Sequence, residues 1–292
     1  MPSIRLAPAK INLTLEVLDR RADGYHGIRS LMVPLALADE LTIEPAATFS
    51  LSCDVAGLGG DDDLVARAYR AVTPPDAARI ALVKRIPTQA GLGGGSSDAA
   101  AVLLAAMDGA FGPVPDRDWL AIARSLGSDV PFFLTQSGAL VEGTGERVTA
   151  VGALPQWHVV IVRPPEVVST AAAYALLDSY SRPPRPRNIS ASLRALEALQ
   201  RGAFDEVVEL MHNDFQDAVA GAHATIGVAL EALRDAGCAK PLLAGSGSCV
   251  FALCRTADER DRIASVLQFP ETFASYSTSF AQPAAWRGTV PA

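Results

Sequence analysis

Polar and apolar residues alternate without exception from residue 10 to residue 17. This period of two predicts a β-strand with Ile11, Leu13 and Leu15 in the core and the opposite face toward solvent. Shorter apolar stretches predict further strands, at Leu31–Leu37, Leu41–Ile43, Ile80–Val83, His158–Val162 and Val250–Cys254.

Apolar residues at spacings of three and four predict helices elsewhere. These are Leu64–Val72, the segment after Ser96, Asp118–Leu126, Ser192–Leu199, Phe204–Val219 and Thr225–Ala236. In the segment after Ser96, Ala99, Val102, Leu103, Ala106 and Met107 fall on one face. Strands mixed irregularly with helices favour the α+β class over repeated βαβ units. Three prolines in Arg182–Arg187 predict a surface loop.

The length of 292 residues favours two domains, and Gly152–Pro155 is a plausible break between them. We therefore expect an N-terminal domain over residues 1–154 and a C-terminal domain over residues 155–292. With 49% hydrophobic and 20% charged residues, the chain has ample material for a core.

The net charge of −7 and the absence of a basic block disfavour nucleic acid and anionic membranes as partners. No signal peptide or membrane span is visible in the sequence, so we expect a cytoplasmic location. The four cysteines form no Cys-x-x-Cys pair and histidine is scarce, so we expect buried, idle thiols and no residues dedicated to a metal.

A glycine-rich segment, Pro87–Ala100, contains four glycines within Gly91–Gly95, followed by Ser96 and Ser97. Glycines let a ligand approach the backbone, and either serine could cap the helix that follows. The N–H groups of a helix N-terminus bind phosphate well, although a plain flexible turn is the alternative. No Gly-Lys-Ser/Thr follows, which excludes a Walker A loop, and the spacing fits a dinucleotide fingerprint poorly.

Three motifs in order resemble those of the galactokinase, homoserine kinase, mevalonate kinase and phosphomevalonate kinase (GHMP) superfamily. They are Ala7–Leu13, Pro87–Ala100 and Leu243–Phe251. Further segments resemble the superfamily members that act on a cytidine-diphosphate-linked methylerythritol in the non-mevalonate isoprenoid pathway: Arg20–His26, Leu126–Phe133, Glu142–Glu146, Val168–Ala171 and Arg187–Asn188. The resemblance implies a ribosomal-S5-like N-terminal domain and a ferredoxin-like C-terminal domain, with the site in the cleft between them.

The resemblance also implies ATP and Mg²⁺ as cofactors and phosphorylation of the hydroxyl at carbon 2 of the erythritol. Asp129 would be the general base and Lys10 the cation beside the phosphoryl group. From the residues alone, Lys10 could instead be solvated and Asp129 could be a helix cap. ATP would be bound by residues of the second and third motifs: Pro87, Gly91, Leu92, Gly93, Gly94, Gly95, Ser96, Ser97, Gly245 and Gly247. A tight turn is the alternative for the last two glycines.

The resemblance places four residues against the small-molecule substrate: Asn12, Tyr25, His26 and Tyr174. Tyr25 and Tyr174 would stack on cytosine and His26 would bind its edge, although ordinary packing also explains these aromatic residues. Asp63, Ser128 and Ala244 depart from the family pattern. A homoserine- or mevalonate-type kinase, a catalytically inactive nucleotide-binding regulator and an oxidoreductase are the rival functions, and we expect a monomer or weak homodimer.

Overall fold

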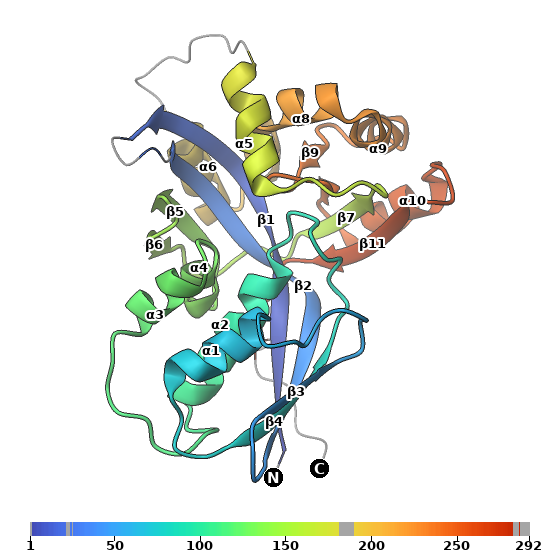
Figure 1. The fold of residues 1–292 in the computed structure, drawn as a ribbon. Helices are drawn as coiled ribbons and strands as arrows, with labels where there is room; N and C mark the ends of the chain where they lie inside the picture. Colours follow the sequence, from blue (N-terminus) through green and yellow to red (C-terminus); the bar gives the residue numbers. More distant parts are fainter. Residues whose placement is uncertain (1, 22–23, 25, 181–189, 283–285, 287–292) are drawn as a thin grey trace.

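Two β-sheets flanked by helices make up the computed structural model, which describes residues 2–21, 24, 26–180, 190–282 and 286 (Figure 1). The larger sheet contains β1 (Ser3–Arg20), β2 (His26–Pro45), β3 (Ser50–Cys53), β4 (Ala78–Val83), β5 (Ala139–Gly143), β6 (Arg147–Ala150) and β8 (His212–Asn213). Its main path is β3-β4-β2-β1-β8, and β5 pairs with both β2 and β6. The smaller sheet has the order β11-β7-β10-β9, formed by β7 (His158–Arg163), β9 (Leu242–Leu243), β10 (Val250–Cys254) and β11 (Ala274–Ser279).

Strands β1 and β2 form one long antiparallel pair that runs through the molecule (Figure 1). The two strands predicted at Leu31–Leu37 and Leu41–Ile43 are parts of the single strand β2. The prediction that β1 has a solvated face is wrong, because every residue from Ala7 to Val17 is buried. The apolar face packs against the smaller sheet, and Thr14 on the polar face donates a hydrogen bond to Ser192 Oγ at 2.7 Å.

Four helices belong to the N-terminal half: α1 (Leu64–Val72), α2 (Gly94–Met107), α3 (Trp119–Leu126) and α4 (Val130–Leu134). Helix α2 is buried nearly all around, since it packs against α1, α4 and β1. Ala99, Val102, Leu103 and Ala106 of the predicted apolar face are buried as expected, whereas Met107 at the end of the helix is 49% exposed. Small alanines allow these close approaches on every side.

Six helices follow in the second half: α5 (Thr170–Ser179), α6 (Ala191–Gln200), α7 (Phe204–Leu210), α8 (Gln216–Ala222), α9 (Ala224–Asp235) and α10 (Ala257–Val266). The continuous helix predicted over Phe204–Val219 is wrong. The chain leaves α7 at Met211, and His212–Asn213 then pairs in parallel with Thr14 and Leu15 of β1. This tertiary pairing overrides the helical pattern on both sides of it.

Backbone contacts join the two sheets. Phe280, directly after β11, forms an isolated antiparallel bridge with Leu35 of β2, and Ala281 donates its N–H to Pro34 O at 2.9 Å. The predicted α+β class is confirmed. Across the described ranges, every helix falls short of the length and apolar character that a bilayer crossing requires. The predicted Arg182–Arg187 loop lies outside the described residues.

Candidate active site

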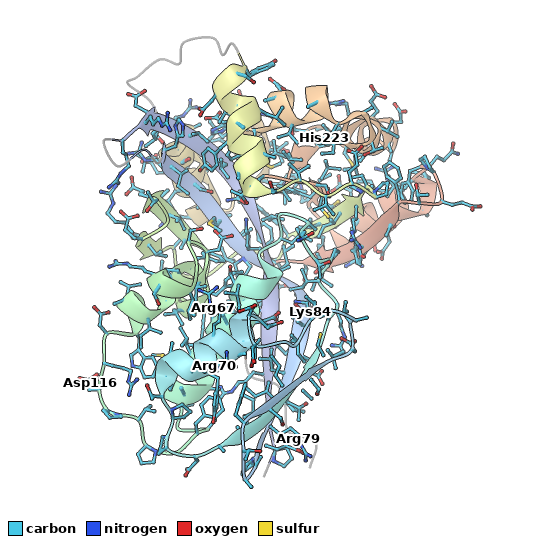
Figure 2. The ribbon with its side chains drawn as sticks, viewed as in Figure 1. Arg67, Arg70, Arg79, Lys84, Asp116 and His223 are labelled. Atoms are coloured by element: carbon cyan, nitrogen blue, oxygen red, sulfur yellow. The ribbon has the colours of Figure 1, made fainter. Side chains whose placement is uncertain are left out.

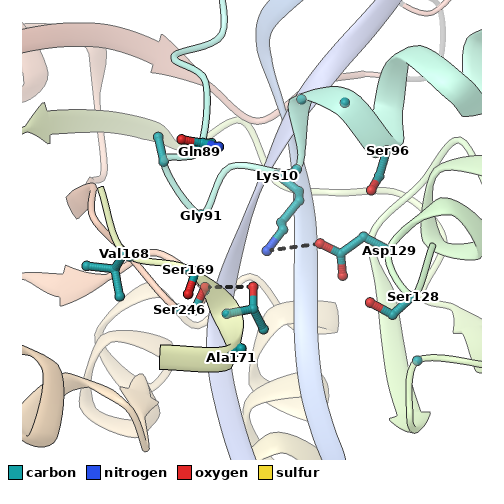
Figure 3. Close-up of a pocket in the computed structure, with 18 of the residues that line it drawn as sticks. Lys10, Gln89, Gly91, Ser96, Ser128, Asp129, Val168, Ser169, Ala171 and Ser246 are labelled. Carbon is teal, nitrogen blue, oxygen red and sulfur yellow. Dashed lines mark hydrogen bonds and ion pairs between the residues drawn. The ribbon is translucent and has the colours of Figure 1, made fainter. Parts of the chain in front are cut away.

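A cleft of about 1590 Å³ opens where the glycine-rich segment, the middle of β1 and the third motif meet (Figure 3). Its walls include residues from all three motifs and from α5. The residues proposed from the sequence that line it are Lys10, Asn12, His26, Pro87, Gly91, Gly93, Gly94, Gly95, Ser96, Asp129, Tyr174, Gly245 and Gly247. Leu92 and Ser97 belong to the same segment but are buried beneath it, with 1% exposure each.

The glycine-rich segment enters α2 without a side-chain cap. Gly93 occupies the cap position with a left-handed φ of 74°, and the helix begins at Gly94. The predicted cap by Ser96 or Ser97 is therefore wrong, because both serines lie inside the first turn. An uncapped helix start leaves its first N–H groups available to an anion in the cleft.

Backbone contacts hold the three motifs together. Lys10 donates its N–H to Leu92 O at 2.9 Å, and Cys249 donates its N–H to Ala90 O at 3.2 Å. A Cβ on Gly91, whose φ is 77°, would overlap the carbonyl oxygen of Ala244. Position 91 therefore admits only glycine, both for its backbone conformation and for this close approach.

Lys10 and Asp129 face each other across the cleft (Figure 3). Lys10 is 4% exposed, so the solvated reading of this side chain is wrong. Its Nζ donates to Asn12 Oδ1 at 2.9 Å and lies 3.6 Å from Asp129 Oδ2. Asp129 precedes α4, yet its carboxylate accepts no hydrogen bond from that helix. The cap alternative therefore gains no support, and the half-exposed carboxylate is free to meet a ligand.

Both the oxygen and the nitrogen of the Asn12 side-chain amide form hydrogen bonds. Its Oδ1 accepts from Lys10, and its Nδ2 donates to Ser30 Oγ at 2.8 Å. Ser30 in turn donates to Thr14 O at 2.6 Å, and all of these side chains are buried. This polar network fixes the direction of the Lys10 ammonium beneath the cleft.

His26 and Tyr174 form a stacked pair at the α5 end of the cleft, with ring centroids 5.5 Å apart and an interplanar angle of 15°. The Nδ1 of His26 lies 3.1 Å from Leu18 O, and its Nε2 lies 3.0 Å from Asp178 Oδ1. Burial, followed by the nearby Asp129 and Asp178 carboxylates, raises the pKa of Tyr174, so its ring stays neutral. Tyr25 lies outside the described residues.

Sequence reasoning missed two residues that shape the cleft. Asn213 donates to Leu243 O at 2.8 Å and to Gly245 O at 2.7 Å, which fixes the third motif. A polar His212-Asn213-Asp214 run inside an apolar helical pattern was the available signal. Asp178 carried no such signal, because only the fold brings it to His26.

The departures from the family pattern have local explanations. Asp63 caps α1 by accepting from Val65 N at 2.9 Å and also accepts from Gly59 N at 3.1 Å. Ala244 is fully buried against Gly91, and its N–H donates to Cys249 O at 2.8 Å. Nothing in the structure explains Ser128.

No group of three or more His, Cys, Asp or Glu side chains suited to a metal ion occurs within the described part of the chain. Burial raises the pKa of the Cys249 thiol to about 12. Burial, with smaller contributions from Cys238 and Glu259, raises that of Cys254 to about 12 as well. Both thiols are therefore protonated at neutral pH.

Two family models match the chain: the GHMP kinases N-terminal domain over residues 63–137 and the GHMP kinases C-terminal region over residues 195–271. The 4-diphosphocytidyl-2-C-methyl-D-erythritol kinase of Deinococcus radiodurans is 42% identical, over 89% of this chain and 87% of the relative. The enzyme of the same name from Thermus thermophilus is 39% identical, over 90% and 92%.

Solved structures of kinases have the same fold as this chain. A crystal structure of 4-(cytidine 5'-diphospho)-2C-methyl-D-erythritol kinase aligns with a TM-score of 0.76 and 35% identity, covering 96% of this chain and all of the other. The homoserine kinase from Cytophaga hutchinsonii shares the fold, with a TM-score of 0.66 at 15% identity over 96% and 95%. The predicted two-domain GHMP kinase fold is thus confirmed. The chain belongs to the GHMP kinases, in the family of the 4-diphosphocytidyl-2-C-methyl-D-erythritol kinases.

Proposed function

We propose that this kinase transfers the γ-phosphoryl group of ATP to the carbon-2 hydroxyl of 4-diphosphocytidyl-2-C-methyl-D-erythritol in isoprenoid biosynthesis. The observation that carries the proposal is the position of Asp129 and Lys10. The pair lies between the uncapped start of α2, which suits phosphates, and the His26–Tyr174 stack, which suits a base. A phosphoryl donor and its acceptor would meet at this point.

Asp129 would take the proton of the attacking hydroxyl, whose oxygen then bonds to the γ-phosphorus while the bond to the ADP oxygen breaks. Lys10 would offset negative charge on the transferred group. The N–H groups at the start of α2 would bind the ATP phosphates, with the Gly245–Gly247 turn on the opposite wall.

A magnesium ion fits this site as a companion of ATP. Asp129 offers one carboxylate in the cleft, and Mg²⁺ commonly binds one or two carboxylates together with substrate phosphates. The ion would offset charge on the phosphates. We propose that Asp129 and the nearby Ser96 hydroxyl are the side chains available to it.

The division at residue 154, the cytoplasmic location and the monomeric or weakly dimeric state stay predictions. So does the stacking of Tyr25 on cytosine. For His26, the structure shows a buried Nε2 without a hydrogen bond, and Asp178 Oδ1 lies 3.0 Å away, so a cytosine edge that binds this atom would approach beside that carboxylate.

A coupled assay of ADP release tests the proposed reaction. The purified protein would be offered ATP with the cytidine diphosphate substrate, homoserine, mevalonate or galactose. We expect turnover with the first substrate alone, because only that substrate carries a base for the aromatic end of the cleft. Turnover with another member of the panel would replace the proposed substrate, and ATP binding without any turnover would favour an inactive regulator.

Replacing Tyr174 by Ala tests whether the α5 end of the cleft binds cytosine. Loss of a ring that stacks on a base costs about 1–3 kcal/mol, so KM for the cytidine substrate should rise roughly fivefold to hundredfold. The value of kcat should change far less, because no step of the transfer uses this ring. Tyr174→Phe keeps the ring and its edge contact with Phe215, and serves as the matched control. An unchanged KM in the alanine variant would show that Tyr174 only packs the helix.

A further inference from the structure

A buried cluster of three charged side chains lies beside the first turn of α2, and none of the three is among the residues assigned to ATP from the sequence. Lys84 Nζ donates to Asp39 Oδ2 at 2.5 Å and to Asp98 Oδ2 at 2.6 Å. The three side chains are 5%, 0% and 4% exposed. They come from three segments: Asp39 from β2, Lys84 from the first position after β4 and Asp98 from α2. Figure 2 shows Lys84 where the chain leaves the sheet, next to that helix.

The cluster connects the two ends of the glycine-rich loop. Strand β4 ends at Val83 and α2 begins at Gly94, so residues 84–93 form the loop between them. At the upstream end, Asp39 Oδ1 accepts from Arg85 N at 2.6 Å and from Ile86 N at 2.8 Å. At the downstream end, Asp98 lies one turn into α2. Lys84 bridges the two aspartates and so ties both ends of the loop to β2.

The same cluster lies directly against the first helical residue. A Cβ on Gly94 would be 3.3 Å from Lys84 Nζ and 3.4 Å from Asp39 Oδ2. The adjoining Gly93 contacts Lys10, whose side-chain Cγ would be 3.0 Å from a Cβ at that position. A movement of the cluster would therefore move the N–H groups that face the cleft.

Three buried charges contribute little to the stability of a fold, because the free energy needed to remove ions from water commonly exceeds the attraction gained between them. Burial raises the pKa of Asp98, with Asp39 adding to the effect, and Asp98 Oδ1 has no hydrogen-bond partner. Burial alone would lower the pKa of Lys84, but the two carboxylates outweigh it and raise the value. Buried polar groups of this kind are best explained by the geometry that they impose.

From these contacts we infer that Lys84, Asp39 and Asp98 are positioning residues for ATP. They hold the ends of the glycine-rich loop at a fixed separation, so that the N–H groups of Gly94 and Gly95 point into the cleft before the nucleotide arrives. The inference rests on the proposed ATP site. It assigns the cluster to binding of the phosphates, and to neither the base Asp129 nor the cytidine end.

Asp98→Ala releases the downstream end while Lys84 and Asp39 remain as a neutral pair, and alanine favours the helix. A hydrogen bond to a charged group contributes enough that KM for ATP should rise about tenfold or more. KM for the cytidine substrate should stay within about twofold, the scatter expected of a site that does not couple to the change. Asp98→Asn should restore KM for ATP, because its amide oxygen accepts from Lys84. Asp98→Ser, which fills part of the space, replaces the alanine variant if the latter does not fold.

Ala105→Gly is the matched control, since it weakens the same buried helix but leaves the cluster intact. The inference fails if folded Asp98→Ala has a normal KM for ATP, if both substrates are affected equally, if Ala105→Gly raises KM for ATP as much, or if Asp98→Asn does not restore it. Failure of the proposed function is distinguishable, because it would show as a wild-type protein that does not phosphorylate the cytidine substrate.

Discussion

Replacing Asp129 by Asn is expected to lower kcat by about 10²–10⁴-fold, the usual contribution of a positioned general base. The amide keeps the size of the side chain but cannot accept the proton of the substrate hydroxyl. The 3.6 Å contact joins this partly exposed carboxylate to the buried Lys10 ammonium, which keeps its hydrogen bond to Asn12, and α4 receives no hydrogen bond from the carboxylate. The fold should therefore survive, and KM for the cytidine substrate should change little, whereas KM for ATP should rise as well because Asp129 is also proposed as a ligand of the magnesium ion. Steady-state kinetics and a thermal unfolding curve of the variant provide the measurement.

Asp118→Asn is the control for the loss of one negative charge in the same region. Asp118 caps the neighbouring helix α3 by accepting from Ala121 N at 2.9 Å, and asparagine caps helices equally well. This variant should have normal kcat. A near-normal kcat for Asp129→Asn would remove the base from the proposed mechanism and leave Asp129 as a charge that only accompanies Lys10.

Replacing Gly95 by Val is expected to raise KM for ATP by about a hundredfold or more, since two charged hydrogen bonds of about 1.5–3 kcal/mol each are put at risk. Gly95 is exposed, has a helical conformation and lines the cleft. A Cβ at this position would meet only Leu64 Cδ1, at 3.4 Å. The added side chain therefore takes up space in the cleft beside Leu64 without meeting other protein atoms, and the free energy of unfolding should be nearly unchanged. Calorimetric titration with ADP and thermal unfolding separate the two effects.

Gly109→Val adds the same side chain at an exposed glycine beyond the helix, with nothing within 4 Å of its Cβ position. Its φ of 80° disfavours valine, so this control should lose stability while it keeps nucleotide affinity. Gly95→Val should thus lose nucleotide affinity and keep stability, whereas Gly109→Val should lose stability and keep nucleotide affinity. Normal nucleotide affinity in Gly95→Val would mean that phosphates do not lie at the start of α2.

Local patterns were sufficient for most elements, and the resemblance to the GHMP superfamily supplied the residues that line the cleft. The alternation in β1, the glycine-rich segment and the two other motifs predicted residues that meet at one place. Local patterns were insufficient where segments distant in the sequence determine the surroundings of a side chain. Lys10 looks solvated in the sequence because its strand alternates, but neighbouring elements cover its polar face and make it a buried cation.

The remaining errors have the same origin. A helical pattern over Phe204–Val219 cannot show that His212 and Asn213 pair with β1. Ser96 and Ser97 are good capping residues, but the left-handed turn at Gly93 starts the helix before them. The partners of Lys84 also come from two segments that no local motif connects to it, so the ion cluster could be recognised only in three dimensions.

The pairing of β8 with β1 has a consequence for synthesis of the chain. Asp214 donates its N–H to Leu15 O at 3.0 Å and accepts from Val17 N at 2.7 Å, which extends the contact beyond the two paired residues. Until residue 214 has left the ribosome, this edge of β1 has backbone groups without their final partners. Such open edges associate with other chains. We therefore expect the nascent enzyme to be exposed to aggregation at this edge while its second half is still being made.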